Sequence, residues 1–268
     1  MAGRGQWKLF AAAVLGTLMV SGGAQAASCG KNASGFEGWK EEFAQQAQAS
    51  GVGRRGLSAL AGANYASKTI SADRNQKSFK LSFEQFMAKR GANAIISKGK
   101  SLKRSNAALF SNIESRYGVP AGALLAIWGM ETGFGAYMGN QNTVSAITTL
   151  AYDCRRPAFF MPHAIAALKL VDKGSISAST VGAMHGEVGH TQFLPANVLK
   201  YGVDGNGDGR VDLKNKADAL ASTANFLRGH GWRAGRGYEG NMGAIAGWNS
   251  ASVYQRAIAA IGAEIDGG

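Results

Sequence analysis

The sequence predicts a mostly α-helical protein. From Phe36 to about Phe110, apolar residues recur at intervals of three and four positions, whereas the alternation typical of half-buried strands is sparse. The chain has 268 residues, 46% of them hydrophobic, which is enough for one sizeable core or a core with a small extra domain. A Gly-x-Gly-x-x-Gly pattern at residues 51–56 lies between helical segments and not after a strand, so we interpret it as an interhelix loop.

The first 26 residues have the layout of a secretory signal peptide. Arg4 and Lys8 precede an apolar run from Leu9 to Val20, and small residues follow up to Ala26. This run is shorter than the roughly 20 residues that a membrane-spanning helix needs, which favours a cleaved signal over a permanent anchor. We therefore expect residues 1–26 to be removed and the mature protein to be exported to the periplasm.

Two cysteines, Cys29 and Cys154, remain after that segment. Export to an oxidising compartment favours a disulfide between them, and two free thiols are the alternative. The residues just before Cys29 lack the large aliphatic side chain that a lipoprotein site favours, so lipidation is not expected.

The chain is strongly basic, with a formal net charge of +12. Such a charge attracts anionic partners such as cell-wall polymers or peripheral anionic surfaces, although a merely solvated basic surface is the alternative. We expect no nucleic-acid partner, because zinc spacing, an RNA-binding aromatic signature and long basic runs are all absent from the sequence.

The stretch from Tyr117 to Gly135 predicts a short buried helix with a glycine-rich exit. Pro120 suits a first helical position, and residues 121–130 carry almost no polar side chain. Glu131 falls seven positions after Leu124, which places its carboxyl on the same face as an apolar stripe. Burial and the negative end of the helix dipole both raise a carboxyl pKa, so Glu131 is a candidate acid. A helix-end glutamate turned toward solvent is the alternative.

Further along the chain we expect apolar helices at about 145–152 and 162–171, then a shaped turn at 186–195 with paired glycines and a terminal proline. A boundary near residues 103–108 would separate an N-terminal helical region, 27–107, from a second region, 108–268. The four histidines lack the spacing of a zinc site, and core or loop hydrogen bonding is the better interpretation.

An acidic loop begins at Asp204 and has the pattern of an EF-hand loop. Oxygen ligands stand at positions one, three and five, and Gly209 occupies position six. Position twelve is Asn215 and not a glutamate, so a later residue must complete the ligation. The predicted calcium ligands are Asp204, Asn206, Asp208, the backbone carbonyl of Arg210, and Asp218. An ion-free turn rich in Asp and Asn is the alternative.

Several motifs together resemble one family. They are Tyr117-Gly-Val-Pro120, Ile127-Trp-Gly-Met-Glu-Thr-Gly-Phe-Gly135, Gly189-His-Thr-Gln-Phe-Leu-Pro195, the loop at Asp204, and Gly229-His-Gly-Trp232. In this order they resemble the membrane-bound lytic murein transglycosylase B family, over roughly residues 36–265. The resemblance implies a mostly helical, lysozyme-like fold, with the catalytic core at 108–268 and a structural calcium loop at 204–218.

The resemblance also implies an activity on peptidoglycan glycan strands, without an organic cofactor, and we expect a monomer. Glu131 stands at the position of the family's single catalytic glutamate. As an acid it would protonate the oxygen between N-acetylmuramic acid and N-acetylglucosamine, and as a base it would take the proton of the muramoyl 6-hydroxyl. That hydroxyl would close on C1 and leave a 1,6-anhydro end.

By the same resemblance, four further residues are expected to contact substrate: Tyr117, Gln192, Trp248 and Asn249. For Gln192 and Trp248, a turn hydrogen bond and ordinary core packing are the respective alternatives. Trp248 replaces a family tyrosine and could stack on a sugar face.

The segment before His190 departs from the family. Ala183 replaces a serine that helps to orient the substrate or the catalytic glutamate, and Glu187 replaces a small residue. Glu187 could be a second active-site carboxylate, which would allow hydrolysis by water as in a muramidase; a solvated loop residue is the other interpretation. A catalytically degenerate protein that binds or scaffolds peptidoglycan is the third alternative.

Overall fold

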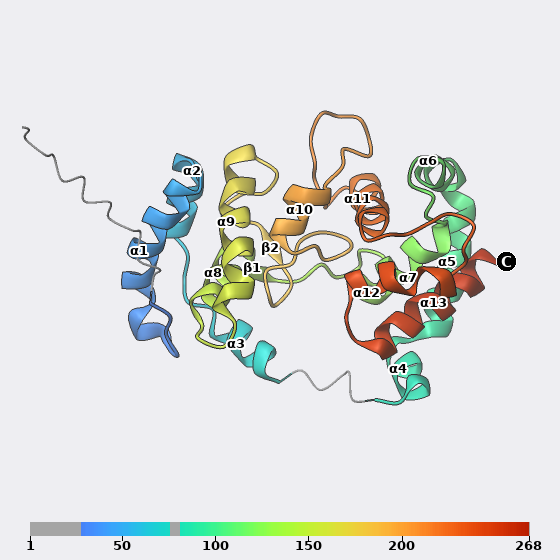
Figure 1. Cartoon of the computed structure of the whole chain (residues 1–268), viewed down its shortest axis with the longest axis horizontal. Helices are drawn as coiled ribbons and strands as arrows, with labels where there is room; N and C mark the ends of the chain where they lie inside the picture. Colours follow the sequence, from blue (N-terminus) through green and yellow to red (C-terminus); the bar gives the residue numbers. More distant parts are fainter. Residues whose placement is uncertain (1–27, 76–80, 268) are drawn as a thin grey trace, which may run out of the picture.

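Helices dominate the structure, a computed structural model that describes residues 28–75 and 81–267 (Figure 1). The predicted mostly helical fold is confirmed, whereas the predicted signal peptide lies outside the described residues. In the first half the elements are η1 (Ala33–Gly35), α1 (Phe36–Ala49), α2 (Arg54–Ala61), α3 (Ser67–Arg74), α4 (Phe83–Arg90), α5 (Ala92–Ser105), α6 (Ala107–Tyr117) and α7 (Ala121–Thr132).

The second half is also helical apart from one small sheet. Its elements are β1 (Gln141–Asn142), α8 (Thr143–Tyr152), α9 (Pro157–Lys173), β2 (Val181–Gly182), α10 (Pro195–Tyr201), α11 (Lys216–Gly229), η3 (Glu239–Asn241), α12 (Met242–Trp248) and α13 (Ser252–Asp266). The two strands pair antiparallel, with Gln141 opposite Gly182. None of the described helices is both long and apolar enough to cross a membrane.

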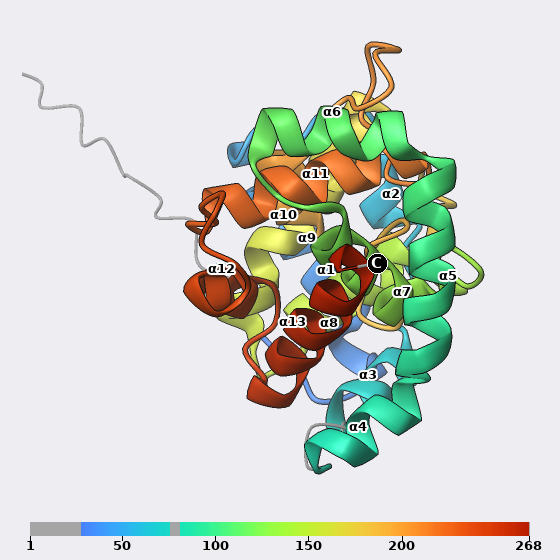
Figure 2. The ribbon, with the colours of Figure 1, turned by 90° about the vertical axis from the view of Figure 1, so that its right-hand side faces the viewer.

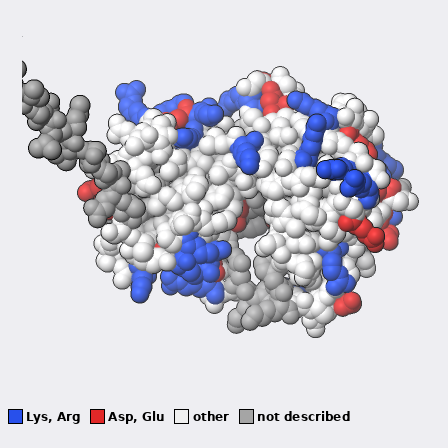
Figure 3. Space-filling model, viewed as in Figure 1, with Lys and Arg blue, Asp and Glu red and all other residues white. Residues whose placement is uncertain are grey.

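The helices form two groups that lie side by side along the long axis (Figure 1). Helices α1, α2, α8 and α9 make one group, and α5, α7, α12 and α13 belong to the other; Figure 2 views the second group from its outer side. A space-filling view shows a hollow between the two groups (Figure 3).

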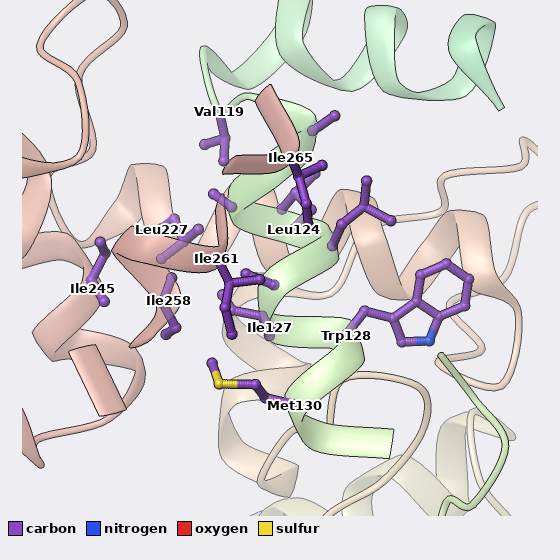
Figure 4. Close-up of a cluster of buried hydrophobic side chains, with 14 of the residues drawn as sticks. Val119, Leu124, Ile127, Trp128, Met130, Leu227, Ile245, Ile258, Ile261 and Ile265 are labelled. Atoms are coloured by element: carbon purple, nitrogen blue, oxygen red, sulfur yellow. The ribbon is translucent and has the colours of Figure 1, made fainter. Parts of the chain in front are cut away.

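The buried helix α7 is the centre of the second group (Figure 4). Eleven of its twelve residues are buried, and it lies against α13, α5, α6 and α11. The crossing with α13 is close because Gly122 has no side chain: a Cβ there would stand 2.2 Å from the carbonyl oxygen of Gly262. Pro120 is the N-cap of α7 and not its first residue, so the helix begins one residue later than predicted, and Gly133 ends it in the left-handed conformation.

The first group has its own core, in which α1, α2 and α3 pack on α8 and α9. Helices α4 and α5 instead join the core around α7 and α13. The buried cores therefore do not divide the chain at residue 107, because the predicted N-terminal region contributes to both of them.

The N-terminal end of the described chain is attached to the end of α8. The predicted disulfide is confirmed: Cys29 and Cys154 are bonded, with their Cα atoms 5.0 Å apart. The backbone N–H of Gly30 also donates to the carbonyl of Tyr152. Helix α9 begins five residues before the predicted start and includes Pro162, whose exposed position lets solvent satisfy the carbonyl left without a partner.

Candidate active site

A cleft of about 650 Å³ lies between the two groups of helices, and Glu131 lines it. Its volume is within the range of about 300–1,000 Å³ that is usual for ligand sites. One wall carries residues of α4, α7 and the 248–250 segment, and the other carries the start of α9 and the 183–187 loop. Residues 192–197, which lead into α10, line the cleft as well.

The carboxyl group of Glu131 is held by two donors from the C-terminal part of the chain. Its Oε1 atom accepts a hydrogen bond from the hydroxyl of Tyr254 at 2.6 Å and another from Nε1 of Trp248 at 3.1 Å. No described residue donates a hydrogen bond to Oε2. The side chain is thus oriented through one oxygen, which leaves the other available to a ligand.

The surroundings of Glu131 favour its protonated form. Burial raises the pKa of this carboxyl, the hydrogen bonds from Tyr254 and Trp248 partly oppose the rise, and the charge of Glu187 adds to it while that of Arg90 opposes it. The net direction is upward, in agreement with the prediction from the sequence. A buried carboxyl with a raised pKa is a suitable general acid.

The loop that carries Gln192 is closed by an isolated antiparallel bridge between Val188 and Phe193. Gln192 itself adopts a left-handed conformation, with φ of 57°, which is unfavourable for a residue with a side chain. Its Nε2 atom donates to the carbonyl of Gly189 at 2.7 Å. Gln192 therefore lines the cleft and also makes the turn hydrogen bond that was the alternative interpretation.

His190 joins this loop to α7, the helix that carries Glu131. The indole Nε1 of Trp128 donates to its Nδ1 at 3.1 Å, and the hydroxyl of Thr132 donates to its carbonyl at 2.6 Å. The histidine thus has the loop hydrogen bonding expected from the sequence, and it fixes Gln192 relative to Glu131.

Glu187 also lines the cleft, but His185 occupies both of its oxygens. Oε2 accepts from the backbone N–H of His185 at 2.9 Å, and Oε1 lies 3.2 Å from the ring Nδ1 of the same residue. Burial lowers the pKa of His185, and the hydrogen bond and charge of Glu187, together with the charge of Asp73, reverse this to give a raised pKa. The departure from the family pattern is therefore a glutamate paired with a neighbouring histidine, whose raised pKa favours the charged imidazole.

The cleft brings together Gln192, Trp248 and Asn249 with Glu131, but not Tyr117. Tyr117 is 8% exposed, belongs to the core around α7, and does not line the cleft. The indole of Trp248 donates to Glu131 and packs edge-on against Phe193 and Phe226. Trp248 thus supports the carboxyl group directly, a contact that the family resemblance did not imply.

Sequence reasoning missed several residues of the cleft. Tyr254 is the shortest hydrogen-bond partner of Glu131, although 123 positions separate the two residues in the chain. Arg90, Arg156 and Phe159 also line the cleft. No local motif marked these positions, because the packing of separate helices brings them into the same cleft as Glu131.

The side-chain ligands predicted in the loop at 204–218 are of the oxygen types that calcium prefers, three carboxylates and one amide. The carboxylate of Asp204 accepts hydrogen bonds from the backbone N–H groups of residues 207–209, and that of the fully buried Asp218 accepts from residues 205, 206 and 212. In the described part of the chain, no three His, Cys, Asp or Glu side chains lie close enough together to hold a metal ion. The chemical types of the predicted ligands therefore fit calcium. Their carboxylates, however, are not gathered around one point in the described part of the chain.

Fold and cleft together define a helical protein with a partly exposed carboxyl of raised pKa, that of Glu131, in a cleft between two groups of helices. The chain belongs to the transglycosylase SLT domain family, whose model matches residues 35–242. The family predicted from the sequence motifs is thereby confirmed.

Individual relatives agree with this assignment. Membrane-bound lytic murein transglycosylase B of Escherichia coli (strain K12) is 33% identical over 121 residues, which are 44% of this chain and 34% of that protein, so the match spans about a third of the relative. SltB3 from Pseudomonas aeruginosa, solved in complex with NAG-anhNAM-pentapeptide, is 29% identical and has a TM-score of 0.80 over 87% of this chain and 80% of its own. Escherichia coli lytic transglycosylase Slt35, solved in complex with calcium, has a TM-score of 0.76 at 19% identity, over 90% of this chain and 96% of its own, and shares the fold.

Proposed function

We propose that this protein is a periplasmic lytic transglycosylase that cleaves the bond between N-acetylmuramic acid and N-acetylglucosamine in peptidoglycan. The observation that carries the proposal is Glu131, a largely desolvated carboxyl with a raised pKa in a cleft of about 650 Å³, with one oxygen to which no described residue donates. Family membership and the similarity to SltB3, a protein solved with NAG-NAM-pentapeptide, support it.

In the proposed reaction Glu131 acts twice. Its protonated Oε2 donates to the glycosidic oxygen as the bond to C1 breaks, and the N-acetylglucosamine side leaves as an alcohol. The resulting carboxylate then takes the proton of the muramoyl 6-hydroxyl while that oxygen bonds to C1. The product has a 1,6-anhydro end, Glu131 regains its proton, and no water is consumed.

Tyr254 and Trp248 have a role at the intermediate stage of this cycle. Both donate to Oε1, so both stabilise the carboxylate that forms when Glu131 releases its proton. Burial disfavours the same carboxylate and provides the driving force for proton release to the substrate. We propose that Gln192 and Asn249, which line the cleft beside Glu131, bind the sugars.

Hydrolysis by a muramidase mechanism would need a second carboxylate to activate water. Glu187 is the candidate because it lines the same cleft. Its two contacts with His185 oppose that role, since they hold the carboxyl group against the histidine and not against a water.

Digestion of purified peptidoglycan tests the proposal. The wild-type protein and Glu131→Gln are compared by mass spectrometry of the released muropeptides, and Glu187→Gln is included as a matched carboxyl-to-amide control. We expect anhydro ends from wild type and from Glu187→Gln, and none from Glu131→Gln. Reducing ends that disappear in Glu187→Gln would refute the transglycosylase and establish the muramidase; binding without release by wild type would identify a glycan-binding or scaffolding protein.

We also propose that the loop at 204–218 holds a structural calcium ion through its predicted ligands. The donor types support this, as does the fold shared with Slt35, which was solved in complex with calcium. The ion would stabilise the start of α11 and take no part in the proton transfers.

A further inference from the structure

A second cavity, of about 520 Å³, is separate from the cleft that contains Glu131. The two share no lining residue. Helix α2, the end of α9 and α10 contribute to the wall of this second cavity, together with the segments 174–178, 188–189 and 211–214. Its volume is within the range of about 300–1,000 Å³ that is usual for small-ligand sites, and the proposed function makes no use of it.

The inner surface of this second cavity is aliphatic. Buried side chains from helices and loops line it: Ala59, Val171, Val188, Val198 and Leu213. The half-buried Ile176 lines it as well. A sugar would leave hydroxyl groups without hydrogen-bond partners on such a surface, which costs free energy. An alkyl chain gains free energy there, because it leaves water without losing a hydrogen bond.

The rim of the second cavity is cationic. Arg55 and Lys214 line it and are exposed, and among the described residues neither side chain has an ion-pair partner. The guanidinium of Arg210 lies beside the rim, because it donates to the carbonyl of Gly174, a lining residue, at 3.0 Å. One carboxylate, that of Asp212, is among the described lining residues, and it accepts from a backbone N–H at 2.9 Å. Cations therefore outnumber carboxylates at this rim.

Backbone hydrogen bonds fix one wall of the second cavity. Val188 and Gly189 belong to this wall, and Val188 is bridged to Phe193, which lines the cleft of Glu131. The backbone N–H of His190 donates to the carbonyl of Leu213 at 2.9 Å. Gly189 permits this close approach, because a Cβ there would stand 2.3 Å from the same carbonyl oxygen. The wall is thus formed before a ligand arrives, which lowers the free-energy cost of binding.

An aliphatic interior with a cationic rim complements a ligand that has an alkyl chain and one anionic end. We propose that the second cavity binds a small anionic amphiphile, a medium-chain carboxylate. Its alkyl chain lies against Ile176 and Val188, and its carboxylate lies beside Arg55 and Lys214. The proposal is independent of the activity proposed for Glu131, because the two sites have no lining residue in common.

Isothermal titration calorimetry of the wild-type protein with decanoate, below the concentration at which decanoate forms micelles, tests this site. We expect saturable binding to one site per molecule and a higher Tm in the presence of decanoate. Two control ligands separate the parts of the argument: acetate lacks the alkyl chain, and decyltrimethylammonium has the chain with the opposite charge. Both should bind more weakly than decanoate, and equally tight binding of either one would overturn the proposal.

Arg55→Gln tests the rim, and Arg54→Gln is the matched control. Both arginines are exposed residues of α2, but only Arg55 lines the second cavity. We expect the Kd for decanoate to rise about two- to fivefold in Arg55→Gln, the range typical of an exposed ion pair, and to stay at the wild-type value in Arg54→Gln. Equal changes in the two variants would show attraction to the basic surface as a whole and would refute the site.

Ile176→Asp tests the interior by placing a carboxylate on the aliphatic surface, and it should raise the Kd about tenfold or more, whereas Ile176→Val should not. Because Ile176 is half-buried, the Tm of each variant is measured without ligand, and Ser58→Trp adds a ring at an exposed lining position as a second way to obstruct the cavity. Wild-type affinity in both Ile176→Asp and Ser58→Trp, or no binding of decanoate to wild type, would overturn the proposal. Neither result bears on the release of anhydro ends, so the proposed function stands or fails separately.

Discussion

The hydrogen bond from Tyr254 to Glu131 allows a quantitative test of the acid–base mechanism. Tyr254→Phe removes the donor at 2.6 Å and leaves Trp248 as the only described donor to Oε1, at 3.1 Å. A hydrogen bond to a charged group contributes about 1.5–3 kcal/mol. If the Tyr254 hydrogen bond stabilises the carboxylate of Glu131 as it forms, loss of this bond lowers kcat about 10- to 100-fold, since each 1.36 kcal/mol is a factor of ten in rate.

The pH dependence gives a second, independent readout. The tyrosine donor stabilises the carboxylate and opposes the effect of burial, so its removal moves the pKa of Glu131 further upward. The protonated acid then persists to higher pH, and the alkaline limb of the kcat/KM profile should shift toward higher pH even as the maximal rate falls. The assay is the initial rate of anhydro-muropeptide release, measured across pH.

Tyr238→Phe is the matched control for this experiment. Its hydroxyl donates to Asp266 at 2.7 Å. Asp266 is the last residue of α13, whereas Tyr254 lies near the start of that helix, so the substitution removes a similar hydrogen bond away from the cleft. We expect lower stability but an unshifted pH profile. A Tyr254→Phe enzyme with kcat within about twofold of wild type and an unmoved alkaline limb would refute the role assigned to Tyr254.

Three further predictions concern stability. Burial gives Glu131 a raised pKa, so its protonated form contributes stability that is full below the ordinary glutamate pKa and is lost as pH rises through the raised value. Glu131→Gln should therefore melt like wild type in acid and at an increasingly higher temperature than wild type as pH rises; a constant difference in Tm across pH would contradict this. Cys29→Ser opens a disulfide that joins residues 125 positions apart, and urea unfolding should show a loss of about 2–5 kcal/mol; an unchanged midpoint would mean that the N-terminal attachment adds nothing to stability. A calcium chelator should lower the Tm, by an amount equivalent to about 2.7 kcal/mol if free calcium was previously at 100 times its Kd. Identical melting curves with and without chelator would remove the ion from the loop at 204–218.

Local patterns in the sequence were sufficient for the elements that depend on nearby residues. The apolar run between Pro120 and Gly133 defined α7 to within one residue, because a glycine able to adopt positive φ follows a segment that must be buried on all sides. Glu131 could be singled out because it is the one acidic residue in that segment. Helix α9 was placed less well, since a proline inside a helix reads locally as a helix start.

The family motifs identified residues of the cleft but not their contacts. Gln192 and Asn249 line it, as the resemblance implied, and so does Trp248, although its indole is hydrogen-bonded to Glu131. Tyr117 belongs to a motif yet is buried in the core. A motif records which residue types occur together, and it does not distinguish a residue that touches the ligand from one that supports the fold.

By itself, the sequence determined the helical class, the family and the acid, because each depends on residue types at short spacing. Only the tertiary structure decided what surrounds that acid. Tyr254 lies 123 residues from Glu131, and Arg156 shares Asp73 across 83 positions, so neither contact has a signature in local periodicity. Whether a carboxyl is protonated, and which charge faces a cleft, depends on desolvation and on neighbours that only the packing of distant helices brings together.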